Sequence, residues 1–232
     1  MPSDESQTAL DTPSILEKMR TEWDARALEN ARHYVATAQT EWSDQAYYDS
    51  GRMNVYHEIL TDLGNVCQGG KTAKQMTVLE IGCGSGRITR ALSEVFGQVY
   101  AVDVSGEMVR QAKEALADRT NVHIFQNNGK DLDILGDIQI DFAFSYIVFQ
   151  HIPSREVIYS YVREVARLLK PGCLFKLQVQ GGTSMDDAPA DTWLGVPFSD
   201  EDAVEMAEKC GFEARHRIGQ GTQYFWLWFF KR

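Results

Sequence analysis

Three glycines at alternate positions, Gly82, Gly84 and Gly86, directly follow a short apolar run that ends near Glu80. Glycine adopts a positive φ without strain and has no Cβ to hinder a ligand, so the pattern predicts a tight turn with closely approached backbone. A helix is expected at 87–95, and its free N–H groups would point towards the turn. A strand, a glycine-rich turn and a helix in this order predict a nucleotide-type site at the carboxyl end of a parallel strand.

A second carboxylate, Asp103, lies near the end of the next apolar run, at 99–104. A carboxylate at this position can accept hydrogen bonds from both hydroxyls of a ribose, and it repels a 2′-phosphate. Glu80 would repel a pyrophosphate but attract a cation, and the glycine spacing differs from the G-x-G-x-x-G of dinucleotide sites. The residues therefore favour a positively charged nucleoside over the nicotinamide cofactor of an oxidoreductase. A purely structural turn, with Asp103 as a helix cap, stays open as the alternative.

Apolar runs and helical repeats alternate along the middle of the chain. The sequence predicts strands at 77–81, 99–104, 122–126, 140–146 and 173–179, and helices at 87–95, 106–117 and 155–169. Such alternation is typical of βαβ units with right-handed crossovers around a parallel sheet.

The C-terminal part has a different pattern. Ser199 and Asp202 have the spacing of a helix-capping pair, and the runs at 212–218 and 222–231 are joined by a glycine-rich segment, which predicts a hairpin. The last run is apolar on both faces, so we expect a strand that is buried on both sides. This would insert a terminal hairpin strand into an otherwise parallel sheet.

The N-terminal part is expected to be helical. Residues 1–12 are polar and acidic and are predicted to be a disordered tail. Residues 13–70 show helical apolar spacing and are predicted to form a helical cap, with a break or a helix start at 50–51. Residues 71–232 form the predicted core, in which the long insertion at 181–198 is expected to be a lid or a specificity insertion.

Composition limits the partners and the compartment. The chain of 232 residues has 23 Lys and Arg against 33 Asp and Glu, a net charge of −10, which argues against nucleic acid as a partner. Four scattered cysteines without zinc-ligand spacing predict reduced thiols, no metal site and a cytoplasmic protein. No apolar run reaches membrane-spanning length, so no membrane contact is expected. The oligomeric state is left open.

Four stretches, at 78–92, 99–109, 141–153 and 169–172, occur in an order that is similar to a known family. Over about residues 71–232 the chain resembles the class I S-adenosylmethionine-dependent methyltransferases, in particular the small-molecule group labelled type 11. The resemblance implies a doubly wound α/β fold with a seven-stranded, Rossmann-like sheet whose last strand is antiparallel. It also implies S-adenosyl-L-methionine as the cofactor.

The resemblance assigns roles to the residues of the first two strands and their turns. The three glycines would let the backbone approach the methionine part of the cofactor, and Glu80 would help to hold its ammonium group. Asp103 would bind the ribose diol, with Val104 and Met108 against the adenine.

Four further positions follow the third and fourth strands. Asn128 and Gly129 would lie near the adenine, where many relatives have an acid at the position of Asn128. The amide oxygen of Asn128 could accept the adenine amino group, although a turn residue without a ligand is the open alternative. Ser145 and Tyr146 would lie near the methionine group and the transferred methyl.

The acceptor is expected to be a small molecule. The Asp/Asn-Pro-Pro-Tyr signature of amine methylation is absent after the fourth strand, and the acidic charge argues against RNA and DNA. His151 follows that strand and is the candidate general base, unless it only packs within its loop. Tyr34, Gln150 and Trp193 are the expected substrate-binding residues. The predicted function is methyl transfer to an O or N nucleophile, and the alternative is a non-catalytic scaffold or sensor that binds S-adenosylmethionine.

Overall fold

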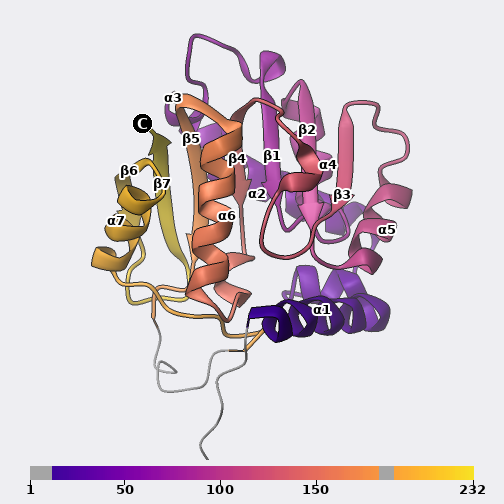
Figure 1. The fold of residues 1–232 in the computed structure, drawn as a ribbon. Helices are drawn as coiled ribbons and strands as arrows, with labels where there is room; N and C mark the ends of the chain where they lie inside the picture. The colour runs from indigo at the N-terminus through magenta and orange to yellow at the C-terminus, as the bar shows by residue number, and fades with distance from the viewer. Residues whose placement is uncertain (1–11, 183–190) are drawn as a thin grey trace, which may run out of the picture.

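The computed structural model describes residues 12–182 and 191–232, which form a seven-stranded sheet flanked by helices (Figure 1). The strand order is β3-β2-β1-β4-β5-β7-β6. The first five strands run parallel, whereas β7 is antiparallel to both β5 and β6. The predicted doubly wound sheet with an antiparallel last strand is therefore confirmed.

The elements have the following bounds. The strands are β1 (Thr77–Ile81), β2 (Gln98–Asp103), β3 (Val122–Gln126), β4 (Ile140–Ser145), β5 (Leu169–Val179), β6 (Phe212–Ile218) and β7 (Phe225–Lys231). The α-helices are α1 (Thr12–Val35), α2 (Asp44–Glu58), α3 (Leu63–Val66), α4 (Arg87–Val95), α5 (Gly106–Ala115), α6 (Arg155–Leu168) and α7 (Asp200–Lys209). Short 3₁₀ turns are η1 (Leu60–Asp62), η2 (Ala73–Gln75), η3 (Asp133–Leu135) and η4 (Phe149–His151).

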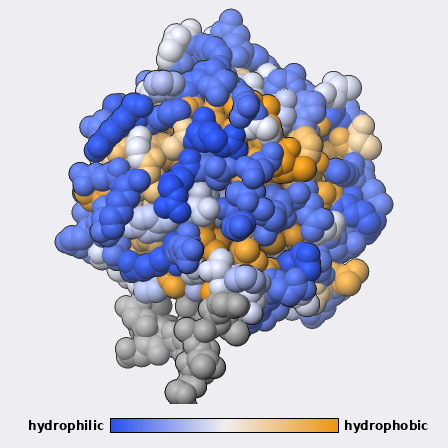
Figure 2. Space-filling model, in the orientation of Figure 1, coloured by the Kyte–Doolittle hydropathy of each residue, from blue (hydrophilic) through white to orange (hydrophobic). Residues whose placement is uncertain are grey.

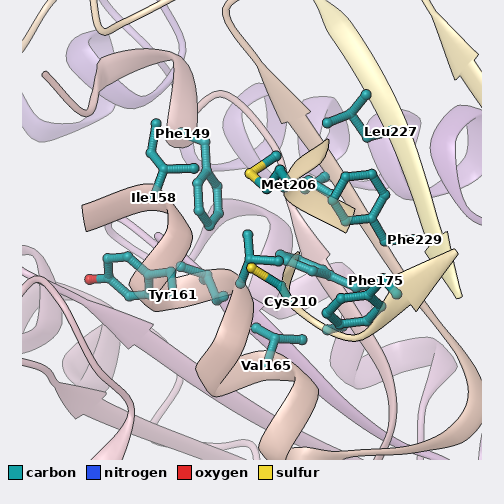
Figure 3. Close-up of a cluster of buried hydrophobic side chains, with 14 of the residues drawn as sticks. Phe149, Ile158, Tyr161, Val165, Phe175, Met206, Cys210, Leu227 and Phe229 are labelled. Atoms are coloured by element: carbon teal, nitrogen blue, oxygen red, sulfur yellow. The ribbon is translucent and has the colours of Figure 1, made fainter. Parts of the chain in front are cut away.

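Two apolar layers hold helices against the two faces of the sheet. One layer joins the sheet to α6 and α7, and Figure 3 shows Phe149, Phe175 and Met206 within it. The other joins the sheet to α2 and α4 and contains Phe96 and Phe142. Removal of apolar surface from water, at about 25 cal/mol per Å², is the main force that holds these layers together. The outer surface seen in Figure 2 is mostly hydrophilic, with hydrophobic residues in scattered small patches.

The last strand, β7, is buried on both faces, as its sequence predicts. Phe225, Leu227 and Phe229 belong to the layer beneath α6 and α7, whereas Trp228 and Phe230 belong to the opposite layer. A strand with apolar residues at every position is stable only between two such layers. This explains why the terminal hairpin inserts β7 beside β5 and leaves the more polar β6 at the sheet edge.

The edge of the sheet that matters for function is the one where the parallel strands end. β1 and β4 are neighbours in the sheet. The connection after β1 leads to β2 on one side, whereas the connection after β4 leads to β5 on the other side, so a crevice opens beyond the ends of these two strands. α1 lies across this end of the sheet (Figure 1) and packs on α5, where Met108 is buried against Ala27 and Ala31. α1 bends at Asn30, whose side-chain oxygen accepts the N–H of His33.

Some expected boundaries need correction. The predicted helix break at 50–51 is wrong, because α2 runs through it. A Cβ on Gly51 would lie 2.2 Å from the carbonyl oxygen of Arg87, so this glycine permits a close crossing of α2 over α4 and does not end a helix. Of the predicted disordered tail, residues 1–11 lie outside the described part, and Thr12 already begins α1.

The predicted insertion at 181–198 is only partly visible, since 183–190 lie outside the described residues. Its end, from Asp191 onward, is held by hydrogen bonds to the segment after β4, including Gly195 N–H to the carbonyl oxygen of Gln150 at 2.7 Å. None of the helices that the structure describes has the length and apolar character of a membrane span.

Candidate functional site

A cavity of about 850 Å³, including the space at its mouth, lies beyond the carboxyl ends of β1, β2 and β4. Its floor carries Glu80, the glycine turn and Asp103, and its roof comes from α1. The α1 residues that line it are Met19, Trp23, Tyr34 and Val35. The site is therefore built by the first strands of the core together with a helix that precedes them in the chain.

The glycine turn has the predicted backbone. Gly82, Gly84 and Gly86 have φ values of 77°, 52° and 88°, a region that disfavours other residues. A Cβ on Gly82 would lie 2.1 Å from the side chain of Val148, and one on Gly84 would lie 2.6 Å from Val35. These two glycines line the cavity, and they also allow its walls to close tightly over the turn.

Gly86 has a different place from the one expected. It is the N-cap residue of α4, and a Cβ there would meet the side chains of Leu116 and Ala112 at 3.0 and 3.4 Å. It is not among the residues that line the cavity. Gly86 thus permits close packing between α4 and the α5 region, and its contact with a cofactor stays a prediction.

Two carboxylates face the cavity without a cationic partner among the described residues. Glu80 is buried and accepts the hydroxyl of Thr89 at 2.6 Å, and burial raises the pKa of its carboxyl to about 7. Asp103 accepts the N–H groups of Gly84 and Ser105 at 2.8 and 2.9 Å. Burial raises the pKa of Asp103 to about 6, although these hydrogen bonds act in the opposite direction. A cationic ligand would restore ionisation of both groups.

Val104 and Met108 line the cavity as expected, but Asn128 does not. The side-chain oxygen of Asn128 accepts the N–H groups of Lys130 and Asp131, both at 3.0 Å, and the residue is exposed. It is the turn residue of the open alternative.

The neighbouring Asn127 lines the cavity, where Asn128 was expected. Its amide nitrogen donates to the hydroxyl of Tyr161 at 2.6 Å, and Figure 3 shows that hydroxyl pointing away from the apolar cluster. Its buried side-chain oxygen, Oδ1, has no hydrogen-bond partner. A buried acceptor without a donor costs free energy, so Oδ1 is the atom that a ligand amino group would satisfy.

Gly129 and Ser145 also lie outside the cavity lining. A Cβ on Gly129 would meet Val104 and Leu16 at 3.1 and 3.3 Å, so this glycine, with a φ of 88°, allows α1 to approach. Ser145 is fully buried and donates its hydroxyl to the carbonyl oxygen of Ile81 at 3.0 Å, which ties the end of β4 to β1. Both residues support the wall of the site instead of forming its surface.

The segment after β4 forms one side of the cavity. Tyr146 lines the cavity, and its ring stacks on Trp226 with centroids 5.3 Å apart; its position near the methyl stays a prediction. Ile147 has a φ of 55°, an uncommon conformation for a β-branched residue, and its N–H donates to the side-chain oxygen of Gln178 at 3.0 Å. Local strain held by neighbouring contacts is typical of functional segments.

His151 lines the cavity but is held on both ring nitrogens. Its Nδ1 lies 2.6 Å from the carbonyl oxygen of Trp193, so Nδ1 carries the proton, and Nε2 faces the amide nitrogen of Gln150 at 3.2 Å. Burial lowers the pKa of His151 to about 4. The imidazole is thus neutral at neutral pH and can accept a proton only as a weak base.

The three expected substrate-binding residues have unequal positions. Tyr34 lines the cavity, whereas Gln150 and Trp193 are not among its lining residues. Gln150 is buried and accepts from Gln178 at 2.7 Å, so it belongs to an internal polar network. Trp193 packs its ring against Tyr34 and His151, with centroids 6.1 and 5.3 Å apart. It therefore contacts two residues that line the cavity without lining the cavity itself.

Sequence reasoning missed Asn127, Arg87 and Val148, as well as Met19 and Val35 of the roof. Asn127 adjoins the residue that was chosen, and no local pattern separates two successive asparagines. Arg87 begins α4 directly after the glycines and lines the cavity, a position that the glycine motif could have indicated. Among the described residues, no group of three His, Cys, Asp or Glu side chains could hold a metal ion.

The chain is similar to known proteins in part of its sequence and in its fold. Residues 78–172 match the family model of the methyltransferase domain. The ribosomal RNA small subunit methyltransferase A of Clostridium botulinum is 26% identical over 126 residues, which is 53% of this chain and 44% of that protein. The ubiquinone biosynthesis O-methyltransferase of Xanthomonas oryzae is 30% identical over 96 residues, 41% of this chain and 39% of the relative. The chain thus spans less than half the length of these curated relatives.

A solved structure extends the likeness to nearly the whole fold. The DhpI–S-adenosylhomocysteine complex superposes with a TM-score of 0.65 at 20% identity, covering 94% of this chain and 98% of that one. At this identity the match speaks for the fold alone, and the match to the methyltransferase domain is limited to residues 78–172. Residues 78–172 are therefore similar in sequence to the methyltransferase domain, and the fold as a whole is similar to that of a protein solved with S-adenosylhomocysteine.

Proposed function

We propose that the protein transfers the methyl group of S-adenosylmethionine to an oxygen or nitrogen of a small molecule. The observation that carries this proposal is the cavity beneath α1, which is lined by two carboxylates without an ion pair and by Asn127, whose buried side-chain oxygen has no hydrogen-bond partner. Such a set suits a ligand that has a cationic end, a diol and an amino group. A nucleoside with an amino-acid tail and a sulfonium has all three.

The residues present fit this cofactor. Glu80 is placed to hold an ammonium group and Asp103 to accept the two ribose hydroxyls. Asn127 Oδ1 replaces the expected Asn128 as the acceptor of the adenine amino group, because it is the buried oxygen that lacks a donor. Val104 and Met108 supply apolar surface for the ring.

The bound cofactor supplies an activated methyl on its sulfonium. The chain's own part is to exclude water, to orient the acceptor and to take up its proton. α1 and the segment at 146–148 enclose the cavity, and this enclosure would exclude water and orient the acceptor. His151 is the candidate for the third: its tautomer leaves the lone pair on Nε2, and this nitrogen would have to exchange the hydrogen bond from Gln150 for the proton of the acceptor.

A small acceptor is supported by this chain's own charge and shape. The net charge of −10 opposes binding to a polyphosphate chain, and the roof of α1 narrows access to the cavity. The two curated relatives are named for a ribosomal RNA and for ubiquinone biosynthesis, so they span both classes of acceptor. A scaffold or sensor that binds the cofactor without transfer is the second candidate.

The first test separates these functions. Calorimetry with S-adenosylhomocysteine and with NAD should show binding of the first only. S-adenosylmethionine is then incubated with a panel of phenols, carboxylic acids and amines, and with RNA, and formation of S-adenosylhomocysteine is measured. We expect turnover with a small molecule. Transfer to RNA alone would contradict the proposed acceptor class, and binding without any transfer would favour the scaffold.

The second prediction concerns the adenine contact. Asn127→Ala removes the unpartnered oxygen and should weaken S-adenosylhomocysteine binding by about tenfold, which is the effect of one buried hydrogen bond. Asn128→Ala is the matched control and should leave the affinity unchanged, because its side chain only closes a turn. Calorimetry of both variants measures this, with circular dichroism as a check on folding. Equal losses in the two variants would refute the assignment to Asn127.

The third prediction concerns pH. Glu80 and Asp103 have folded pKa values of about 7 and about 6, against ordinary values of 4.5 and 3.8. Because both are raised, their contribution to the free energy of unfolding is present below about pH 4 and is lost as the pH rises through about 6 to 7. S-adenosylhomocysteine needs the ionised forms, so its affinity should increase over the same interval.

Thermal shifts with S-adenosylhomocysteine, measured between about pH 5.5 and 8, test this pH dependence. The shift should grow with pH, and Glu80→Gln should flatten the upper part of the curve. A shift that is independent of pH in the unsubstituted protein would show that neither carboxylate binds the ligand.

The fourth prediction concerns His151. His151→Asn retains a nitrogen donor towards the carbonyl oxygen of Trp193 but removes the basic nitrogen. With an acceptor identified as above, kcat should fall by about tenfold or more, at the low end for general-base catalysis because the base is weak. S-adenosylhomocysteine affinity is the control and should not change. Full kcat in this variant would limit His151 to positioning the loop at 191–195.

A further inference from the structure

Arg87 is a buried cation in the wall of the cavity that no carboxylate of the chain satisfies. It is the first residue of α4, has 5% of its surface exposed and lines the cavity. Its Nη1 donates to the side-chain oxygens of Ser50 and Asn54 at 3.2 and 2.6 Å. Its Nε is buried and has no hydrogen-bond partner.

The absence of a counter-charge is unusual for a group so deeply buried. Within residues 12–182 and 191–232, Arg87 forms no ion pair, and the carboxylate whose field reaches it, Glu80, is bonded to Thr89 instead. Lys176 provides the contrast, because it is equally buried but lies 3.5 Å from both Glu58 and Asp62. Burying a guanidinium without an anion costs several kcal/mol, which a bound anion would offset.

The contacts of Arg87 fix which edge of the guanidinium is left for a ligand. Ser50 and Asn54, both on α2, engage Nη1 alone, so Nε and Nη2 have no hydrogen-bond partner among the described residues. The edge formed by Nε and Nη2 has the two parallel N–H groups that bind a carboxylate in bidentate fashion. α2 thus holds the side chain in one orientation, and the cost of ordering it is already met before a ligand arrives.

Arg87 also lies at a definite end of the cavity. Burial lowers the pKa of its guanidinium, and the charged or polar groups whose fields reach it are Tyr47 on α2, Tyr146 after β4 and Glu80 on β1. Asp103 ends β2 and Asn127 follows β3, and these two strands lie on the side of β1 that faces away from β4. The cation is therefore close to the part of the cavity assigned to the ammonium group and the methyl, and not to the adenine.

We propose that Arg87 is an anion-binding residue of this cavity and takes a carboxylate on its Nε–Nη2 edge. The inference rests on the proposed function only where it names the molecule that carries the carboxylate; the anion site itself does not depend on it. Two carboxylates could occupy the position: the amino-acid carboxylate of the cofactor, or that of an acidic acceptor. In either case the site recognises a planar, singly charged anion next to Glu80.

The experiment compares Arg87→Met with Arg90→Met. Arg90 lies on the same helix, but it donates to the carbonyl oxygen of Ala115 and pairs with Asp118 outside the cavity. Arg90→Met therefore removes the same charge from the same helix as Arg87→Met and serves as the control. The ligands are S-adenosylhomocysteine and its decarboxylated analogue, 5′-deoxy-5′-(3-aminopropylthio)adenosine. Calorimetry gives the dissociation constant of each ligand for each protein.

If the carboxylate is that of the cofactor, Arg87→Met should weaken S-adenosylhomocysteine by at least about tenfold and leave the analogue unchanged. If it belongs to the acceptor, neither nucleoside changes, but acetate or inorganic phosphate should raise the melting temperature of the unsubstituted protein saturated with S-adenosylhomocysteine. That anion effect should be lost in Arg87→Met and kept in Arg90→Met. Both outcomes support the proposal and separate the two sources.

Equal behaviour of Arg87→Met and Arg90→Met in every titration would overturn the proposal. Removal of an uncompensated buried charge should not lower the melting temperature, whereas loss of a purely structural residue should. Arg87→Lys is the second variant: it keeps the charge but not the two-pronged edge, and should weaken the same ligand as Arg87→Met. The anion titration is repeated without nucleoside, so it still reads out if the protein binds no S-adenosylhomocysteine and the proposed function fails.

Discussion

Charge held in a closed space at the carboxyl ends of β1 and β2 is the constraint on which the site depends. Glu80, Asp103 and Arg87 all face one cavity, and none forms an ion pair with another described residue. The two carboxyl pKa values are raised by burial, which measures the cost of keeping these groups from water. A fold that only needed stability would pair these charges, so their isolation indicates a ligand that completes them.

The closed space itself depends on close packing between distant segments. Gly82 and Gly84 leave room for Val148 and Val35, and Gly129 leaves room for Leu16, so three glycines allow two walls and a roof to meet. α1 supplies that roof, although it lies at the start of the chain and the strands begin some forty residues later. The glycines thus serve contacts within the protein as well as the approach of a ligand.

His151 shows how packing changes the chemistry of a residue type. An exposed imidazole titrates near neutral pH, but here burial lowers the pKa to about 4 and the carbonyl oxygen of Trp193 fixes the tautomer. The same contact fastens the described end of the 181–198 segment to the cavity wall. His151 therefore links the position of Trp193 to the site, whatever part it takes in proton transfer.

The sequence alone determined the sheet, its antiparallel last strand, and the positions of Glu80, Gly82, Gly84 and Asp103, because these follow from short-range patterns of apolar residues, glycines and strand-end carboxylates. It could not choose between Asn127 and Asn128, or show that Gly51 and Gly86 serve helix contacts, since those depend on which atoms meet across the fold. The roof formed by α1 and the isolation of Arg87 were likewise decided by tertiary structure. Burial and missing partners are properties of the surroundings of a residue, and the surroundings come from segments far apart in the chain.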